Sequence, residues 1–250
     1  MEKKLGAKNW LIGIGIIVIG VIVIMGIFRT RAFAPTIEVN DEKSFSVDGI
    51  TSLQVNMTKE QIRIIQTQTN DVRLHYHGTS KQNLKLSTEA SNRTVIIGST
   101  RTTNLMQEDL YMDIYLPKSY EAKLIIHTTS GNVTSEKIQA ETMTINSTSG
   151  KIALNDCAGN LNLKASSGDI SAAYNIFGKQ DINITATSGS IRLQLPSTAE
   201  FSLEAKTSTG KLYSDFSVKG DSKTMTGQIG TNSNKVAVQT STGSINLVKK

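Results

Sequence analysis

The residues best able to do chemistry in this sequence are a series of small, hydroxyl-rich tetrapeptides, such as S-T-S-G at residues 147–150. Such a segment could cradle a phosphate or present a nucleophilic serine. A phosphate-binding loop leads from its glycines into a helix, whereas the residues around this motif have the pattern of strands. A nucleophilic serine would lie in a sharp elbow or beside a recurring histidine, and the motif shows neither arrangement. The tetrapeptide therefore needs a structural explanation.

His75 and His77 form a second candidate group, because residues two apart on a strand point to the same face. Two imidazoles on one face could bind a metal ion. No Asp, Glu or Cys is fixed beside them by the sequence, so we predict a solvated strand face and no metal site. The third histidine, His127, stands alone in its repeat.

Acidic residues and the single cysteine complete the candidate reactive groups. Asp156, Asp169 and Asp181 share no position relative to the tetrapeptide glycines, so they predict no carboxylate pair of the kind that glycoside hydrolysis requires. Cys157 cannot form a disulfide within the chain, and we expect a small apolar core thiol. We predict no catalytic residues and no cofactor.

The amino terminus carries a membrane-spanning signal. Residues 10–28 are nineteen uncharged residues, which as a helix span about 28 Å, close to a hydrocarbon core of about 30 Å. A cleavable signal peptide has a shorter apolar region, and Pro35 directly follows the cleavage-like sequence Ala32–Ala34. We predict a cytoplasmic segment at 1–9, a transmembrane helix at 10–28, a juxtamembrane linker at 29–35 and an extracytoplasmic domain at 36–250. The localisation is then the cell membrane, single-pass, with the carboxy-terminal domain extracellular.

The formal charge of +6 does not indicate a nucleic-acid partner. Residues 1–34 carry a net charge of +4, which leaves +2 spread over residues 35–250. A nucleic-acid binder shows a basic patch on one face, and no basic run with interleaved aromatics occurs here. The basic surplus lies around the predicted anchor, for which membrane lipid is the expected partner.

Beyond Pro35 the chain alternates apolar and polar residues as half-buried strands do. From residue 124 the pattern becomes a repeat whose tetrapeptides end in glycine at spacings of 19, 18, 21, 21 and 33 residues. Periods near 20 are typical of repeat architectures. The glycines, which we predict to be structural corners, are Gly131, Gly150, Gly168, Gly189, Gly210 and Gly243.

The positions around these glycines define the corner. Seven and five residues before each glycine, and two residues after it, every residue is apolar; at Gly150 these are Met143, Ile145 and Ile152. The apolar residues lie at odd offsets before the glycine and at an even offset after it. In a straight strand they would therefore point to opposite faces, so the strand cannot continue unbroken through the motif. Each motif is therefore predicted to turn the chain, with Gly150 as a conformationally permissive residue.

Two folds satisfy this change of phase. In a β-solenoid each rung of about 20 residues turns at the Ser-Gly corner and like residues stack between rungs. In an antiparallel β-meander Ser-Gly is a hairpin loop that pairs Ser147 with Ile152. A longer duplication places Leu-Pro, a glutamate, a leucine and a final glycine at identical offsets from Leu116 and from Leu195, 79 residues apart. The last interval, of 33 residues, departs from the period and is expected to be a loop or an irregular terminal rung.

The corner series, the strand L-Y-M-D-I-Y-L-P at residues 110–117 and the single amino-terminal anchor resemble the putative-adhesin domains of unknown function of Gram-positive cell envelopes. The layout is similar to the membrane-anchored member of an operon that responds to antibiotics interfering with lipid II. The resemblance covers roughly residues 36–248 and implies a β-solenoid-like fold without established catalytic residues.

We therefore expect an all-β protein, a single-domain β-solenoid preceded by one transmembrane α-helix, with the meander as the alternative. The expected function is non-catalytic binding or scaffolding at the envelope, accessory to a cell-envelope stress response, and the expected partner is an envelope protein or cell-wall component. Two alternatives remain open: a β-helix enzyme that degrades cell-wall polysaccharide, and a purely structural surface spacer. The sequence does not indicate the oligomeric state.

Overall fold

The structure is a computed structural model that describes residues 35–100, 108–231 and 234–250. All regular elements in these ranges are β-strands, and they form two sheets. Within these ranges we find no helix long and apolar enough to cross a membrane. The helix predicted at 10–28 lies outside the described residues. Residues Glu38–Lys250 form one compact unit.

We call the two sheets sheet A and sheet B and give their strands in spatial order. Sheet A consists of β1 (Ile37–Ser46), β4 (Asp71–Ser80), β7 (Asp109–Pro117), β3 (Gln61–Thr67), β9 (Val133–Ser135), β11 (Ile152–Leu154), β13 (Ile170–Ala173), β15 (Ile191–Leu195), β21 (Ile245–Lys249) and β17 (Leu212–Ser214). Sheet B consists of β18 (Lys219–Gly220), β19 (Thr224–Ile229), β16 (Phe201–Thr209), β20 (Lys235–Thr242), β14 (Ile182–Ser188), β12 (Cys157–Ser167), β10 (Ile138–Ser147), β8 (Lys123–Thr128), β2 (Ser52–Met57), β6 (Thr94–Ser99) and β5 (Leu86–Ser91).

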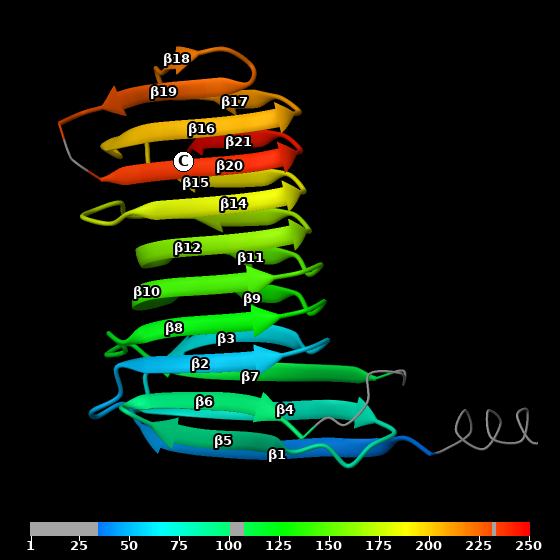
Figure 1. Cartoon of the computed structure of the whole chain (residues 1–250). Coiled ribbons are helices and arrows are strands. Elements are labelled where there is room, and N and C mark those ends of the chain that lie inside the picture. The colour runs from blue at the N-terminus through cyan, green and yellow to red at the C-terminus, as the bar shows by residue number, and fades with distance from the viewer. Residues whose placement is uncertain (1–34, 101–107, 232–233) are drawn as a thin grey trace, which may run out of the picture. The chain divides into compact units, whose positions relative to one another are not determined.

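Successive rungs pair in parallel, which confirms the β-solenoid-like fold. Each repeat runs along sheet B, turns at its glycine and returns through a shorter strand of sheet A (Figure 1). Ile145 pairs with Ile126 on one side and with Leu163 on the other. The antiparallel meander is ruled out, because Ser147 pairs with Thr128 and Ala165 in the neighbouring rungs rather than with Ile152.

The core lies between the two sheets. All eighteen apolar positions of the repeat are buried, and they form columns in which like residues stack from rung to rung. Few aromatic residues are needed, because the branched aliphatic side chains of two facing sheets fill the narrow interior. Tyr76, Tyr120, Tyr174 and Phe201 are the largest fully buried side chains among the described residues.

The duplicated Leu-Pro segments mark two of the places where the chain skips a rung. From β7 the chain continues to β8, although the rung of β2 and β3 lies between them. From β15 it continues to β16, although β20 and β21 lie between. Both connections begin with the same turn, in which the Tyr120 amide donates to the Pro117 carbonyl at 3.1 Å and the Ala199 amide donates to the Pro196 carbonyl at 2.9 Å.

The 33-residue interval is neither a plain loop nor a terminal rung. After β17 the chain forms β18 and β19, and β19 pairs antiparallel with β16 at the outer edge of sheet B. The chain then returns to the interior of the stack, where β20 pairs with both β14 and β16. At the other end β5 covers β6 and β4 covers β7, both antiparallel. Antiparallel strands thus cover the last parallel strand of sheet B at both ends, which limits the exposure of unpaired parallel edges.

The six corner glycines form a column along one side of the stack. A Cβ added to Gly150 would overlap the carbonyl oxygen of Gly131, and one added to Gly168 would meet that of Gly150. The same relation links the remaining corner glycines to the neighbouring rung. Gly150 is not among the residues with positive φ, so the explanation by conformational freedom is wrong at this position. Glycine is required there because two backbones approach too closely for a side chain.

Candidate functional site

Two adjoining polar features lie on the outer face of sheet A, and Arg63 belongs to both. We call the first the Asp113 cluster; its members are Arg63, His75, His77, Tyr111 and Asp113. The second is a depression beside β3, which we call the β3 hollow; ten residues of β3, β9 and β11 and of the connections that follow β9 and β11 line it.

Strand register brings the Asp113 cluster together. In the antiparallel pairing of β4 with β7, His75 lies opposite Asp113 and His77 lies opposite Tyr111. In the parallel pairing of β3 with β7, Arg63 lies opposite Asp113. Because directly opposite residues share a face and lie close together, three strands distant in sequence place His75, Asp113 and Arg63 in one row.

Asp113 is held by Arg63, by His77 and by the Tyr115 hydroxyl, which donates to Oδ2 at 3.5 Å. Arg63 donates from Nε to Oδ1 and from Nη2 to Oδ2, both at 2.6 Å, which makes a two-pronged ion pair. His77 Nε2 lies 3.2 Å from Oδ2. The Asp113 side chain is only 3% exposed although it lies on the outer face, while Arg63 is 46% exposed. The hydrogen bonds and charge of Asp113 raise the pKa of Arg63 above its usual value against the opposing effect of burial.

Stacked rings fix the orientation of the imidazoles. The ring centroids of His75 and His77 are 4.3 Å apart, and His77 stacks on Tyr111 at 5.3 Å. The Arg63 guanidinium lies 5.3 Å from the centre of the Tyr111 ring. His77 Nε2 also lies 3.3 Å from Arg63 Nη2. A neutral imidazole nitrogen either donates or accepts, so His77 Nε2 donates to Asp113 or accepts from Arg63, but not both at once.

The structure supplies the carboxylate that was missing beside the histidines. His75, His77 and Asp113 each present one possible ligand atom, and these atoms all lie within 4.8 Å of one another. The prediction of a solvated face without a metal site rested on the absence of such a carboxylate. Sequence spacing alone could not identify Asp113, because it lies 36 residues from His77 and only the pairing of β4 with β7 brings the two together.

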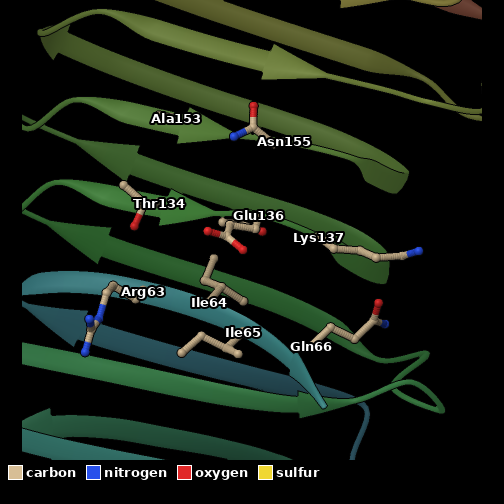
Figure 2. Close-up of a pocket in the computed structure, with 10 residues that line it drawn as sticks. Arg63, Ile64, Ile65, Gln66, Thr134, Glu136, Lys137, Ala153 and Asn155 are labelled. Carbon is tan, nitrogen blue, oxygen red and sulfur yellow. The ribbon is translucent and has the colours of Figure 1, made fainter. Parts of the chain in front are cut away.

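The β3 hollow has a volume of about 540 Å³ (Figure 2). It exists because β3 is seven residues long whereas its neighbour β9 has three. Of the β3 residues, β9 pairs only with Ile62, Arg63 and Ile64. The part of β3 beyond Ile64 therefore has no paired strand on the side of β9.

The rim of the hollow is polar. Thr134, Glu136, Asn155 and Gln66 contribute hydroxyl, carboxylate and amide groups, and Ile65 adds an apolar patch (Figure 2). Ser135 is 4% exposed, and its Oγ has no hydrogen-bond partner among the described residues. Ser135 pairs with Ile64 and Leu154, whose side chains lie in the core, so its hydroxyl faces the interior between the sheets and not the outer hollow.

The remaining residues considered from sequence have structural surroundings. Asp169 and Asp181 each accept a backbone amide of a neighbouring rung, from Ser190 at 2.9 Å and from Lys235 at 2.7 Å. Asp156 lies 3.6 Å from Lys137, so the three carboxylates serve separate contacts. Cys157 is buried, and burial raises the pKa of its thiol to about 12. His127 contacts Asn146 of the next rung at 3.3 Å on sheet B.

A profile of the Toastrack DUF4097 family matches residues 50–143 and 122–248. The chain belongs to the Toastrack DUF4097 family. One solved structure similar to this Toastrack chain supports the same fold. A putative cell adhesion protein from Clostridium sporogenes is 15% identical, with a TM-score of 0.58, and the match covers 86% of this chain and 100% of the other.

Two further structures match over a similar length with lower TM-scores. A putative adhesin from Bacteroides fragilis is 12% identical with a TM-score of 0.32, covering 85% of this chain and 97% of that one. A putative adhesin from Parabacteroides distasonis is 11% identical with a TM-score of 0.32, covering 87% and 98%. No curated protein matches this Toastrack chain.

Glu60 is a buried polar residue of the Toastrack core that the sequence reasoning missed. It occupies the corner position of the rung that precedes Gly131, and its carboxylate accepts the amides of Thr58 and Lys59, both at 2.8 Å, and the hydroxyl of Tyr76 at 3.1 Å. The signal was present, because Leu53, Val55 and Ile62 stand at the same offsets from Glu60 as the repeat residues do from a corner glycine. This rung has Glu60 where the other corners have glycine, so the glycine series does not include it.

Proposed function

We propose that this Toastrack protein is a non-catalytic binding module of the cell envelope, held in the membrane by residues 10–28. The β3 hollow carries the proposal, because it combines a polar rim with an apolar patch at Ile65 beside a stretch of β3 that β9 leaves unpaired. A pure spacer does not need such a depression, and a ligand that supplies hydrogen bonds to the rim would gain from filling it. The adhesin names of the structural neighbours are consistent with a surface role.

The binding proposal is tested by filling the hollow. The Asn155→Arg substitution places a long cationic side chain at the rim, and Asn183→Arg makes the same change at an exposed site on sheet B. Tagged full-length protein is crosslinked in intact membranes and recovered together with its neighbours. We expect the wild type and Asn183→Arg to retain an envelope component that Asn155→Arg loses. Identical recovery by all three proteins, or by an anchor without the domain, would favour the spacer.

The proposal includes a localisation in the cell membrane with the domain outside the cell. Residues 10–28 have the length and apolar character of a membrane span, and the domain is proposed to face outward. Protease added to intact cells should therefore digest the domain and leave a protected amino-terminal fragment. A domain that resists protease until the cells are lysed would refute the orientation.

A role accessory to the envelope stress response is proposed from the resemblance of the layout alone. It is tested by deleting the gene and measuring survival with antibiotics that interfere with lipid II. We expect greater sensitivity in the deletion strain and recovery with the wild-type chain. Recovery with the Asn155→Arg chain to the same level would separate this role from the hollow.

A further inference from the structure

We propose that His75, His77 and Asp113 form a binding site for a divalent transition-metal ion of the zinc class. The proposal concerns the Asp113 cluster and is independent of any ligand in the β3 hollow. Imidazole nitrogen and carboxylate oxygen are common ligands of such ions.

The distances are close to those that one ion requires. Zinc binds nitrogen and oxygen at about 2.0–2.2 Å, so two ligand atoms on one tetrahedral ion are about 3.3 Å apart. His77 Nε2 and Asp113 Oδ2 are 3.2 Å apart. The third ligand atom, on His75, lies within 4.8 Å of both. The His75 ring must turn so that its nitrogen approaches the other two atoms and completes three ligands.

A fourth ligand is near on the edge strand. Glu42 of β1 has Oε1 3.9 Å from His75 Nε2 and is 57% exposed, so it can move toward the ion. Asn40 of the same strand has Oδ1 2.9 Å from this nitrogen and orients the ring in the metal-free protein, so an ion bound at Nε2 must displace this contact. Neighbours that orient the imidazoles are typical of metal sites, and the stack of His75 on His77 and Tyr111 adds a second restraint.

Arg63 is the competing cation, and it defines a further consequence of the proposal. Its Nη2 occupies Asp113 Oδ2 at 2.6 Å, the oxygen nearest to His77. A bound ion must take Oδ2 and leave Arg63 to Oδ1, where Nε already donates at 2.6 Å. The ion and Arg63 therefore compete for one carboxylate, and removing Arg63 should strengthen metal binding.

The site is tested on full-length protein in detergent after removal of metals with a chelator. Co²⁺ is added and followed by its visible absorption, and Zn²⁺ is then titrated by calorimetry. We expect one ion per chain. The substitutions His75→Gln and His77→Gln should each weaken binding at least about tenfold, since even loss of a supporting contact commonly costs that much.

The control is His127→Gln, because His127 is the remaining histidine and lies on sheet B away from the cluster. This variant should bind as the wild type does, and Arg63→Gln should bind more tightly. Melting curves without metal verify that each variant is folded. No saturable binding by the wild type, or equal binding by folded His75→Gln and His77→Gln, would overturn the site. Unchanged or weaker binding by Arg63→Gln would refute Asp113 as a ligand.

Discussion

At the scale of single residues, close backbone approach determines which side chains the corners accept. Ser147 donates its hydroxyl to the Gly150 carbonyl at 3.0 Å and accepts the Gly150 amide at 2.9 Å. The glycine is thereby held against the carbonyl of Gly131, where no Cβ fits. The tetrapeptide thus allows two rungs to approach closely, and the hydroxyl of Ser147 forms its hydrogen bonds with the backbone of the corner.

Substituting Gly150→Val should destabilise the domain strongly. The new side chain must push apart two rungs, which we expect to cost about 2 kcal/mol or more and to lower the melting temperature by at least about 4 °C. Gly178→Val is the matched control, because an added Cβ there meets no atom within 4 Å. Equal melting temperatures for the two variants would contradict the close-approach explanation.

The thiol of Cys157 should be nearly inert in the folded protein. Burial raises its pKa from 9.0 to about 12, and only the thiolate reacts with alkylating agents. Alkylation at pH 8 should be at least about a hundredfold slower in native protein than in denaturant. Because folding raises this pKa, the stability from the buried thiol is present below about pH 9 and is lost as pH rises toward about 12. Equal rates in both conditions would refute the burial.

At the scale of elements, the repeat was predictable because its period is local. Three apolar offsets around each glycine were sufficient to identify the strands and to require a corner, and all of those residues are buried. What the sequence could not supply is which strands pair when the chain passes over a rung. Asp113 therefore remained unassigned until β4 and β3 were placed on either side of β7. The β3 hollow could not be predicted from the sequence either, because it arises from the unequal lengths of β3 and β9.

At the scale of the whole molecule, two strands that come late in the sequence, β20 and β21, lie inside the stack and not at its end. In an ordinary solenoid each rung contacts only the rungs next to it in sequence, and a terminal rung can be lost with little effect on the others. Here β20 lies between β14 and β16, and β21 lies between β15 and β17. The last strands are therefore internal, which the 33-residue interval indicated only as an irregularity.

A chain truncated after Gly230 should lose the order of β16 and β17 as well. β17 pairs only with β21, and β16 would keep only the antiparallel strand β19. Hydrogen exchange of amides in residues 201–214 should therefore become fast in the truncated chain. Removing Lys250 alone is the control and should leave these amides protected. Continued protection in the truncated chain would mean that β16 can close directly onto β14.

The internal position of β20 and β21 also sets a time order for folding. A protein is synthesised from its amino terminus, so β20 and β21, which lie inside the stack, are made after β16 and β17, which lie outside them. The rung of β16 and β17 leaves the ribosome earlier, yet its parallel partners β20 and β21 do not exist until residues 235–249 have been made. The outermost rung therefore waits for a later segment of the chain before it can pair with the rest of the stack.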